Sequence, residues 1–403
     1  MKEEKMMILS MLQEGKITPE EAVKLIEALE DLETPHSSKE TSFHQENKDD
    51  KDKTNKILNK TLDEIGSDIS SALTSVFNGL KDIGTSIGIN NNTSTINLDL
   101  EKDITDIQNP IIDLRAVNGS ITLSQTTEDK LLIKVTVQYK NGLLDNDKEF
   151  YKFFTEGSRI VFAPIYNNDV SVRLEVSLPK KDYTEIIINS TNGKINIEDL
   201  QSNILKCGTT NGSIVISDIT VKDINLSTKN GKIECKNTKS DGINLVTTNS
   251  SINLTDVVAK KIEAHTANSK IIIKDVKSDK IKCKTSNSTI DAVNISSEII
   301  NFSTSNGKII FDDVDFNKAK EIQLFTSNGS INSELKGLKK EAYLDLETSM
   351  GNINLEIPNL VFETNKQINL GIKKIIAHSI NYKENEDHLR FIASTSNGSI
   401  KIS

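Results

Sequence analysis

Acidic side chains recur at one position of a repeat in the C-terminal half of this chain. The column consists of Asp199, Asp218, Asn237, Asp256, Asp275, Asn294 and Asp313. Stacked carboxylates resemble the arrays of oxygen ligands that calcium prefers, so weak cation binding is one interpretation. The alternative is that each Asp or Asn begins a turn by bonding its own backbone. The column lacks the glycine-rich spacing of calcium-binding solenoids, which favours the turn, and we predict no metal or cofactor.

The residues that perform acid–base or nucleophilic chemistry are scattered rather than grouped. The five histidines are His36, His44, His265, His378 and His388. We expect all of them at the surface, and His265 falls at an outward position of the repeat. No nucleophile and base stand at a recognisable spacing. A carbohydrate-active β-helix enzyme, the remote alternative, needs clustered acids and aromatic platforms, whereas aromatics are only 4% of this chain. We therefore expect no enzymatic activity.

The repeat itself is marked by Asn followed by Gly or Ser every 19 residues. The regular Asn positions are Asn192, Asn211, Asn230, Asn249, Asn268, Asn287 and Asn306. Two steps of 22 lead to Asn328 and Met350, and the dyad returns at Asn397. A Thr stands two residues before the dyad at Thr209, Thr228, Thr247, Thr266, Thr285, Thr304 and Thr326. If coils stack, both columns form hydrogen-bonded ladders along the axis, and Asn-Gly supplies a corner that tolerates positive φ.

Within each unit, hydrophobic residues alternate with polar ones. Counting the Asn as position one, positions 4 and 6 are apolar, as in Ile195 and Ile197, and so are positions 14 and 16, as in Ile224 and Leu226. Period-two alternation is typical of strands with one buried face. The chain is therefore predicted to be mainly β. We expect a single-stranded parallel β-solenoid with coils of about 19 residues and two main strands per coil.

The three cysteines fall on inward positions of this repeat. Cys207 and Cys283 share position 16 four coils apart, roughly 19 Å, which is beyond the reach of a disulfide, and Cys235 occupies position 6. We expect all three to act as small hydrophobic residues of the core.

The first ninety residues are predicted to be helical. Residues 1–33 form a helical hairpin, and residues 34–55 are a polar, disordered linker by composition. Residues 56–90 form a long amphipathic helix. Its apolar stripe consists of Leu58, Leu62, Ile65, Ile69, Leu73, Val76, Leu80, Ile83 and Ile87. A stripe of this length packs on the solenoid, mediates self-association, or contacts a membrane through residues 56–88.

The solenoid is predicted to have irregular ends. Residues 94–188 are an irregular β-rich start, and residues 189–403 are the regular solenoid. Solenoid ends expose apolar core and strand edges, so terminal repeats must differ from internal ones. Residues 358–388 interrupt the register before the last coil, which makes them a candidate cap or partner surface.

Charge and targeting signals limit the possible partners and location. The formal net charge is −9, of which residues 1–56 carry −5, so we predict no nucleic-acid partner. The N-terminus has acidic residues and no apolar core typical of a signal peptide. No run approaches the roughly 18 apolar residues of a transmembrane helix. The expected location is therefore the cytoplasm.

Two sequence motifs resemble a known bacterial group. Val176–Lys180 leads into Ser190–Ile195 and then into the Asn-Gly coils, which resembles the "putative adhesin" β-solenoid domain of unknown function. Glu14–Ala22 resembles the N-terminal hairpin of YvlB-like and LiaX-like proteins of Gram-positive bacteria. The resemblance implies a role in the envelope stress response, including sensing of cationic antimicrobial peptides, and a cell-surface location by non-classical export.

Three functions remain open on the sequence. The first is a binding or scaffold protein whose mildly acidic solenoid receives a cationic peptide or protein. The second is a structural or adhesive surface protein, which the missing export signal disfavours. The third is the β-helix enzyme considered above. The first is preferred.

Overall fold

The computed structural model describes residues 93–403, except 144–148, 167, 336 and 369–370. The predicted hairpin 1–33, linker 34–55 and amphipathic helix 56–90 lie outside these residues. All regular elements of the described part are strands, labelled β1 to β23, and they belong to one continuous sheet. No helix in this part of the chain has the length and hydropathy needed to cross a membrane.

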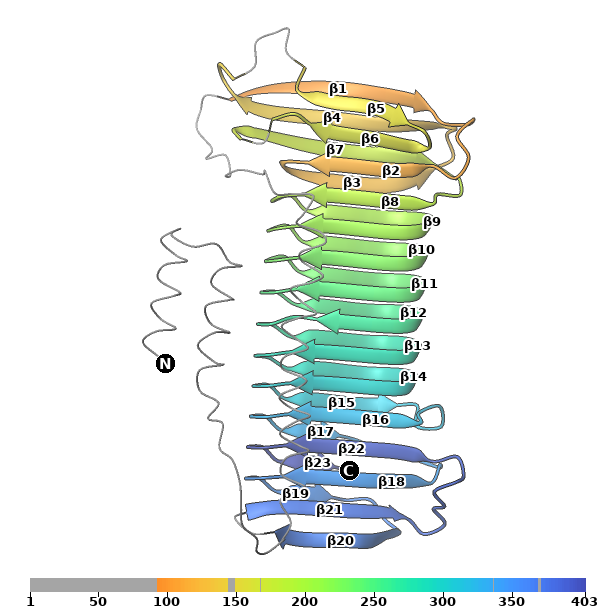
Figure 1. Ribbon diagram of the computed structural model, residues 1–403, viewed down its shortest axis with the longest axis vertical. Coiled ribbons are helices and arrows are strands. Elements are labelled where there is room, and N and C mark those ends of the chain that lie inside the picture. Colours follow the sequence, from red (N-terminus) through yellow and green to blue (C-terminus); the bar gives the residue numbers. More distant parts are fainter. Residues whose placement is uncertain (1–92, 144–148, 167, 336, 369–370) are drawn as a thin grey trace, which may run out of the picture. The chain divides into compact units, whose positions relative to one another are not determined.

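The central part is a stack of parallel rungs (Figure 1). Its strands are β9 (Ile195–Thr209), β10 (Ile214–Thr228), β11 (Ile233–Thr247), β12 (Ile252–His265), β13 (Ile271–Thr285) and β14 (Ile290–Thr304). Each pairs in parallel with the next at an offset of 19 residues, so that Thr228 lies opposite Thr247 and Ile214 opposite Ile233. The predicted stacking of coils along one axis is confirmed.

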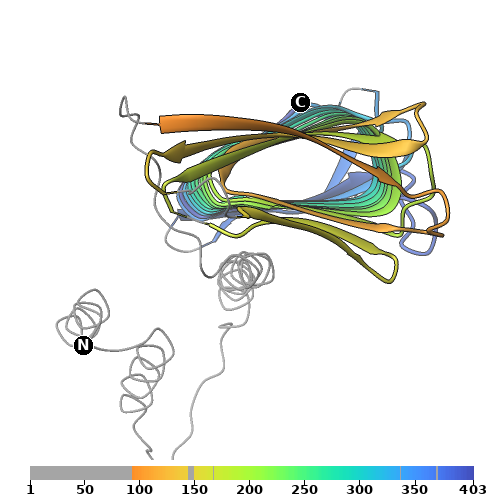
Figure 2. The ribbon, with the colours of Figure 1, turned by 90° about the horizontal axis from the view of Figure 1, so that it is seen from above.

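The number of strands in each coil differs from the prediction. Instead of two strands, each central coil contains one strand of 14 or 15 residues. This strand bends at position 8, where Asp218 has a φ of 57° and is skipped by the ladder between Ser217 and Ile219. The two predicted strands are the two arms of this bent strand, and they form the two walls of a flattened coil (Figure 2).

The core runs through the middle of the coils. Side chains at positions 4, 6, 9, 14 and 16 point inward, and representatives such as Ile214, Ile216, Ile219 and Leu226 are at most 1% exposed. Cys207, Cys235 and Cys283 are buried and free. Burial raises the pKa of all three thiols, because the thiolate would lose its hydration.

The N-terminal end combines stacked rungs with antiparallel hairpins. Its strands are β1 (Thr93–Asp103), β2 (Ile111–Ala116), β3 (Asn118–Thr126), β4 (Lys130–Lys140), β5 (Tyr151–Glu156), β6 (Arg159–Pro164), β7 (Val170–Pro179) and β8 (Glu185–Ser190). On one wall β3 lies between β9 and β7, and β4 continues antiparallel from β7 to β1. On the other wall β2 lies between β8 and β6, and β5 pairs antiparallel with β6.

The C-terminal end has a non-sequential order of rungs. Its strands are β15 (Ile309–Val314), β16 (Glu321–Thr326), β17 (Ile331–Ser333), β18 (Ala342–Thr348), β19 (Ile353–Leu355), β20 (Leu360–Ile368), β21 (Ile372–Ser379), β22 (Leu389–Thr395) and β23 (Ile400–Ile402). The last coil, β22 and β23, inserts between the coil of β16 and β17 and that of β18 and β19. Residues 358–388 contribute the hairpin β20–β21, and β21 pairs antiparallel with β18.

Candidate binding surfaces

The Asn column lies on the outer side of one corner of the coil and bonds to itself. The amide nitrogen of each Asn donates to the amide oxygen of the Asn in the preceding rung, as from Asn249 to Asn230 at 2.6 Å and from Asn268 to Asn249 at 2.8 Å. The same ladder connects Asn192, Asn211, Asn230, Asn249, Asn268, Asn287, Asn306 and Asn328. Because each amide uses a donor and an acceptor in the ladder, the column holds the corner together.

The Thr column lies on the inner side of the same corner. Its hydroxyls do not bond to one another; each donates to a backbone carbonyl of the preceding rung, as from Thr247 to Gly231 at 3.0 Å. The other members are Thr209, Thr228, Thr266, Thr285, Thr304 and Thr326. All are at most 3% exposed, so these hydroxyls satisfy buried backbone acceptors and are closed to a ligand.

Positive φ occurs at the Asp and Asn residues of position 8 and not at the corner glycines. The corner glycines are absent from the residues with positive φ, so the expected positive-φ corner at Asn-Gly is wrong. Gly212 is required by space instead, because a Cβ there would lie 1.8 Å from the carbonyl oxygen of Gly193. Positive φ occurs at position 8, from 44° at Asn237 to 57° at Asp218. Asp and Asn tolerate this left-handed conformation better than most residues.

The position-8 column therefore fits the turn interpretation. Asn294 donates to the Asp275 carboxylate at 2.5 Å, and Asn237 donates to Asp218 in the same way. Within residues 93–403 as described, no group of three or more His, Cys, Asp or Glu side chains is arranged to hold a metal ion. The geometry gives the cation interpretation no support.

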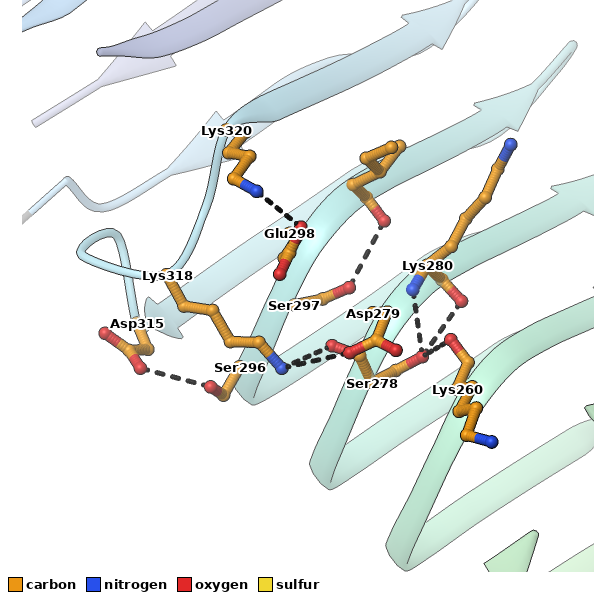
Figure 3. A network of polar contacts seen from close by, with 11 residues as sticks. Lys260, Ser278, Asp279, Lys280, Ser296, Ser297, Glu298, Asp315, Lys318 and Lys320 are labelled. Atoms are coloured by element: carbon orange, nitrogen blue, oxygen red, sulfur yellow. Dashed lines mark hydrogen bonds and ion pairs between the residues drawn. The ribbon is translucent and has the colours of Figure 1, made fainter. Parts of the chain in front are cut away.

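Charged side chains at position 12 of the coils, which we call the second bend, pair with lysines of neighbouring rungs (Figure 3). Lys260 contacts Asp241 of the preceding rung at 2.9 Å, and Lys320 contacts Glu298 at 2.8 Å. Lys318 donates to the Ser278 carbonyl at 2.8 Å and lies 3.7 Å from Asp279. Exposed pairs of this kind contribute little stability, but they neutralise the acids that a cationic ligand would need.

One group of aromatic rings lies on the C-terminal cap. Tyr343 is on β18, His378 on β21, and Tyr382 and His388 are on the segment that joins β21 to β22. The ring centre of Tyr382 lies 5.6 Å from that of Tyr343, 5.2 Å from that of His378 and 4.9 Å from that of His388. We call these four residues the cap cluster. All four are only partly buried, so the ring faces are not absorbed into the core.

Acidic residues surround the cap cluster. Burial and the nearby Asp345 and Glu363 raise the pKa of Tyr343, and burial with Glu384 and Glu363 raises that of Tyr382. Glu363 on β20 is 48% exposed and lies 3.7 Å from the His378 ring. Burial is the main cause of both shifts, the carboxylates add to it, and Arg390 partly offsets them.

A pocket of about 660 Å³ opens on the same cap. Its walls come from the loop around Leu338, the turn before Leu360 and the residues after β21, including Ile380. Ile380 is 63% exposed, and Phe362 on the outermost strand is 48% exposed. Residues 379–381 line the pocket, and their neighbours His378 and Tyr382 belong to the cap cluster, so the two features are continuous along the chain.

The sequence located this surface only in part. Residues 358–388 were recognisable because they break the repeat, but no motif joins Tyr343 and Tyr382, which are far apart in sequence. His378 and His388 are partly exposed. The surface position predicted for His265 is wrong, because its side chain is only 3% exposed despite its outward position. His36 and His44 lie outside the described residues.

The fold described above is that of a parallel β-solenoid with antiparallel hairpins at both ends. A family comparison agrees with this class: the Toastrack DUF4097 family model matches residues 110–268 and 222–403, and the chain belongs to this family. Residues 3–33 match the SHOCT-like domain. No protein with a curated description matches the chain.

The solved structures that match this protein share little sequence with it. A putative cell adhesion protein from Clostridium sporogenes is 10% identical, with 77% of this chain and 99% of that chain covered and a TM-score of 0.25. A putative adhesin from Parabacteroides merdae is 8% identical, with coverage of 78% and 97% and a TM-score of 0.36. A putative lipid binding protein from Parabacteroides distasonis is 13% identical, with coverage of 78% and 98% and a TM-score of 0.33.

Proposed function

We propose that this chain is a non-enzymatic binding protein of the bacterial envelope stress response, and that its C-terminal cap receives a cationic peptide or protein. The observation that supports the cap is the grouping of Tyr343, Tyr382 and two histidine rings beside Glu363. Aromatic faces attract ammonium and guanidinium groups, and adjacent carboxylates add to this attraction. The resemblance to YvlB-like and LiaX-like proteins supports the cellular role and action at the cell surface.

The cap is favoured over the second bend because of Glu363, the acid beside its rings, whereas the cap acids Asp387 and Glu386 have lysines at 2.8 and 2.7 Å. Along the second bend, Asp241 and Glu298 each have a lysine within 3 Å. On the cap, Asp345 shares Lys374 with Glu347, whereas the contact described for Glu363 is a histidine. A lysine or arginine of a partner therefore gains more beside Glu363 than beside Asp241 or Glu298, which already have a lysine.

The proposal is tested by binding of fluorescein-labelled decalysine to the full-length protein, measured by anisotropy at low salt. Tyr382→Ala and Glu363→Gln are each expected to weaken binding by roughly three- to tenfold, the range of an exposed cation–π or ion contact. Glu175→Gln is the matched control, because Glu175 is an exposed acid on β7 at the opposite end. Equal effects of Glu363→Gln and Glu175→Gln would assign binding to net charge and reject the cap.

A structural or adhesive surface role is the second candidate, favoured by the exposed Phe362 and Ile380 on the outermost hairpin and its adjoining segment. An adhesive surface of this kind binds through apolar contact. It therefore predicts that Phe362→Ser impairs attachment to cells while decalysine binding is absent or insensitive to Tyr382→Ala.

A further inference from the structure

One corner of the solenoid carries lysines but no acidic residue. It is the corner of the Asn ladder, and we define the corner strip as each ladder Asn, the residue before it and the two residues after it. From the coil of Asn192 to that of Asn328, and again at Asn397, none of these positions holds Asp or Glu. Acids are frequent elsewhere in the same coils, at positions 8 and 12 among others. The corner strip is therefore an edge that lacks negative side chains.

Position 3, the last position of the strip, alternates between lysine and a hydroxyl residue from rung to rung. The backbone holds these residues in line, since Ile195 donates to the Ser213 carbonyl and Ile214 to the Lys232 carbonyl, both at 2.9 Å. Adjacent members are ~4.8 Å apart, and successive lysines are ~9.6 Å apart. The lysines are Lys194, Lys232, Lys270 and Lys308. The partly exposed hydroxyl residues that alternate with them are Ser213, Ser251, Thr289 and Ser330.

Most ammonium groups of the strip are open to a ligand. The exposed lysines of the strip whose side chains form no hydrogen bond or ion pair with the described residues are Lys194, Lys229, Lys270 and Lys308. Lys232 is partly exposed and contacts Glu234 of the same strand wall at 2.7 Å. The strip therefore presents a line of positive charges, only one of which is already paired.

Folding accounts for part of this pattern only. A distance of two rungs between lysines limits their repulsion, which explains the alternation. It does not explain the absence of acids, because the second bend alternates differently: there Lys260 lies 2.9 Å from Asp241 of the preceding rung, and the two charges neutralise each other. A carboxylate in place of Ser251 would lie between Lys232 and Lys270 and attract both. The corner strip lacks such an acid and keeps its positive charge.

We propose that the corner strip binds a linear acidic polysaccharide in which every second sugar carries a carboxylate. An extended, equatorially linked pyranose is about as long as one rung spacing, so sugars correspond to rungs and carboxylates to alternate rungs. Lysines then pair with the carboxylates, and Ser251 and Thr289 bond to hydroxyls of the neutral sugars. The Asn ladder adds donors, because it uses one of the two hydrogens on each amide nitrogen, as at Asn249.

The length of the strip suits a polymer. Six rung steps separate Lys194 from Lys308, which is roughly 29 Å. A single exposed ion pair contributes little, but several pairs along one chain act together. A polymer therefore gains an affinity that a monosaccharide does not reach.

A nucleic acid suits the strip less well. The strip contains no aromatic side chain on which a base could stack. Phosphates of a duplex strand follow one another every ~3.4 Å along the axis, which is much closer than the lysines. The neutral donors between the lysines match sugar hydroxyls better than a continuous row of phosphates.

The first test measures binding of end-labelled hyaluronan oligosaccharides to the full-length protein by fluorescence anisotropy at low salt, since hyaluronan carries a carboxylate on every second sugar. Lys270→Gln is expected to weaken binding about two- to fivefold, and its combination with Lys194→Gln and Lys308→Gln at least about tenfold. Lys277→Gln is the matched control, because Lys277 is exposed in the same coil but outside the strip. Absence of binding by the parent protein, or equal losses in Lys270→Gln and Lys277→Gln, would overturn the proposal.

The second test examines the position and the class of the ligand. Ser251→Asp should weaken hyaluronan binding by at least about fivefold, because the new acid pairs with both neighbouring lysines, whereas Thr220→Asp, at an exposed site outside the strip, should not. Tyr382→Ala on the cap should leave hyaluronan binding unchanged, and a loss would assign the ligand to the cap instead. Carboxyl-reduced hyaluronan should not bind. Oligothymidylate or polyphosphate binding as tightly through the same lysines would reject a polysaccharide in favour of phosphate polymers.

Discussion

At the scale of single residues, the coil depends on three types of side chain with separate functions. Asn connects rungs through its amide, and Thr supplies a hydroxyl to a buried carbonyl. Gly occupies the corner in coils such as those of Gly212 and Gly231, where a Cβ would lie less than 2 Å from the carbonyl oxygen of the preceding rung, whereas Ser250, Ser269 and Ser288 occupy it in the coils between. Asp or Asn accepts the positive φ that bends each strand. These functions account for the repeated residue types without assigning a ligand to them.

The steric role of the corner glycine predicts a large difference between two Gly→Ala variants. In Gly231→Ala the new Cβ would lie 1.6 Å from the Gly212 carbonyl oxygen, so backbone of the two rungs must shift to admit it. We expect a loss of about 2–5 kcal/mol in the free energy of unfolding. In Gly242→Ala the Cβ meets only the flexible Asp223 side chain at 2.9 Å, and the expected change is within about 1 kcal/mol.

Urea unfolding followed by circular dichroism measures both variants. A midpoint for Gly231→Ala that matches that of Gly242→Ala would show that the corner relaxes. The close approach of Gly212 and Gly231 would then not be the reason for glycine at this position.

The sequence predicted which residues share a column but not the backbone angle of each column. A period of 19 shows that Asn211 and Asn230 have equivalent surroundings, and alternation shows that Ile214 faces the core. Neither distinguishes a glycine required by positive φ from one required by close packing. Alternation likewise predicted an outward His265, but it carries no information about what lies over an outward side chain.

At the scale of elements, the two ends of the solenoid are built by insertion of strands distant in sequence. Asn118 precedes Asn192 in the corner ladder although 74 residues separate them, because the strands β4 to β7 that intervene in sequence extend the sheet beyond β2 and β3. At the other end Asn397 bonds to Asn328 at 2.6 Å, across 69 residues. Such pairings are invisible to a search for a constant period. The cap cluster depends on them, since Tyr343 and Tyr382 meet only when β21 folds back on β18.

The inserted strand β22 predicts a contrast between two phenylalanines. Phe391 on β22 is fully buried, and its strand joins β16 to β18. Phe391→Ala is expected to cost about 3–5 kcal/mol, because it leaves a cavity at this junction. Phe362 on the outermost strand is 48% exposed, so Phe362→Ala should change stability by less than about 1 kcal/mol.

Hydrogen exchange can separate the local effect of Phe391→Ala from global unfolding. Amides of β18 and β21 should exchange faster, while those of β10 and β11 keep their protection. Uniform acceleration throughout the described strands would show that the cap is not attached through β22 alone.

At the scale of the whole solenoid, stability is a sum over neighbouring rungs. The strands β10 to β13 each pair only with the rungs directly before and after them. At the two ends of this run, β9 continues into β3 and β8, and β14 continues into β15 and β16. In a stack of this kind each coil contributes its own folding term and an interface with each neighbour. A defect therefore weakens the adjacent coils most, and its influence declines along the axis.

A cavity in a central rung makes this decline measurable. Ile271 on β13 faces the core and is fully buried, while the adjacent Ile272 faces outward and is partly exposed. Ile271→Ala is expected to destabilise its region by about 2–5 kcal/mol and to speed amide exchange in β12, β13 and β14 more than in β9. Ile272→Ala should produce a much smaller change with no such profile. If exchange in β9 accelerates as much as in β13 after Ile271→Ala, the stack unfolds as one cooperative unit, because the interfaces between rungs then outweigh the stability of any single coil.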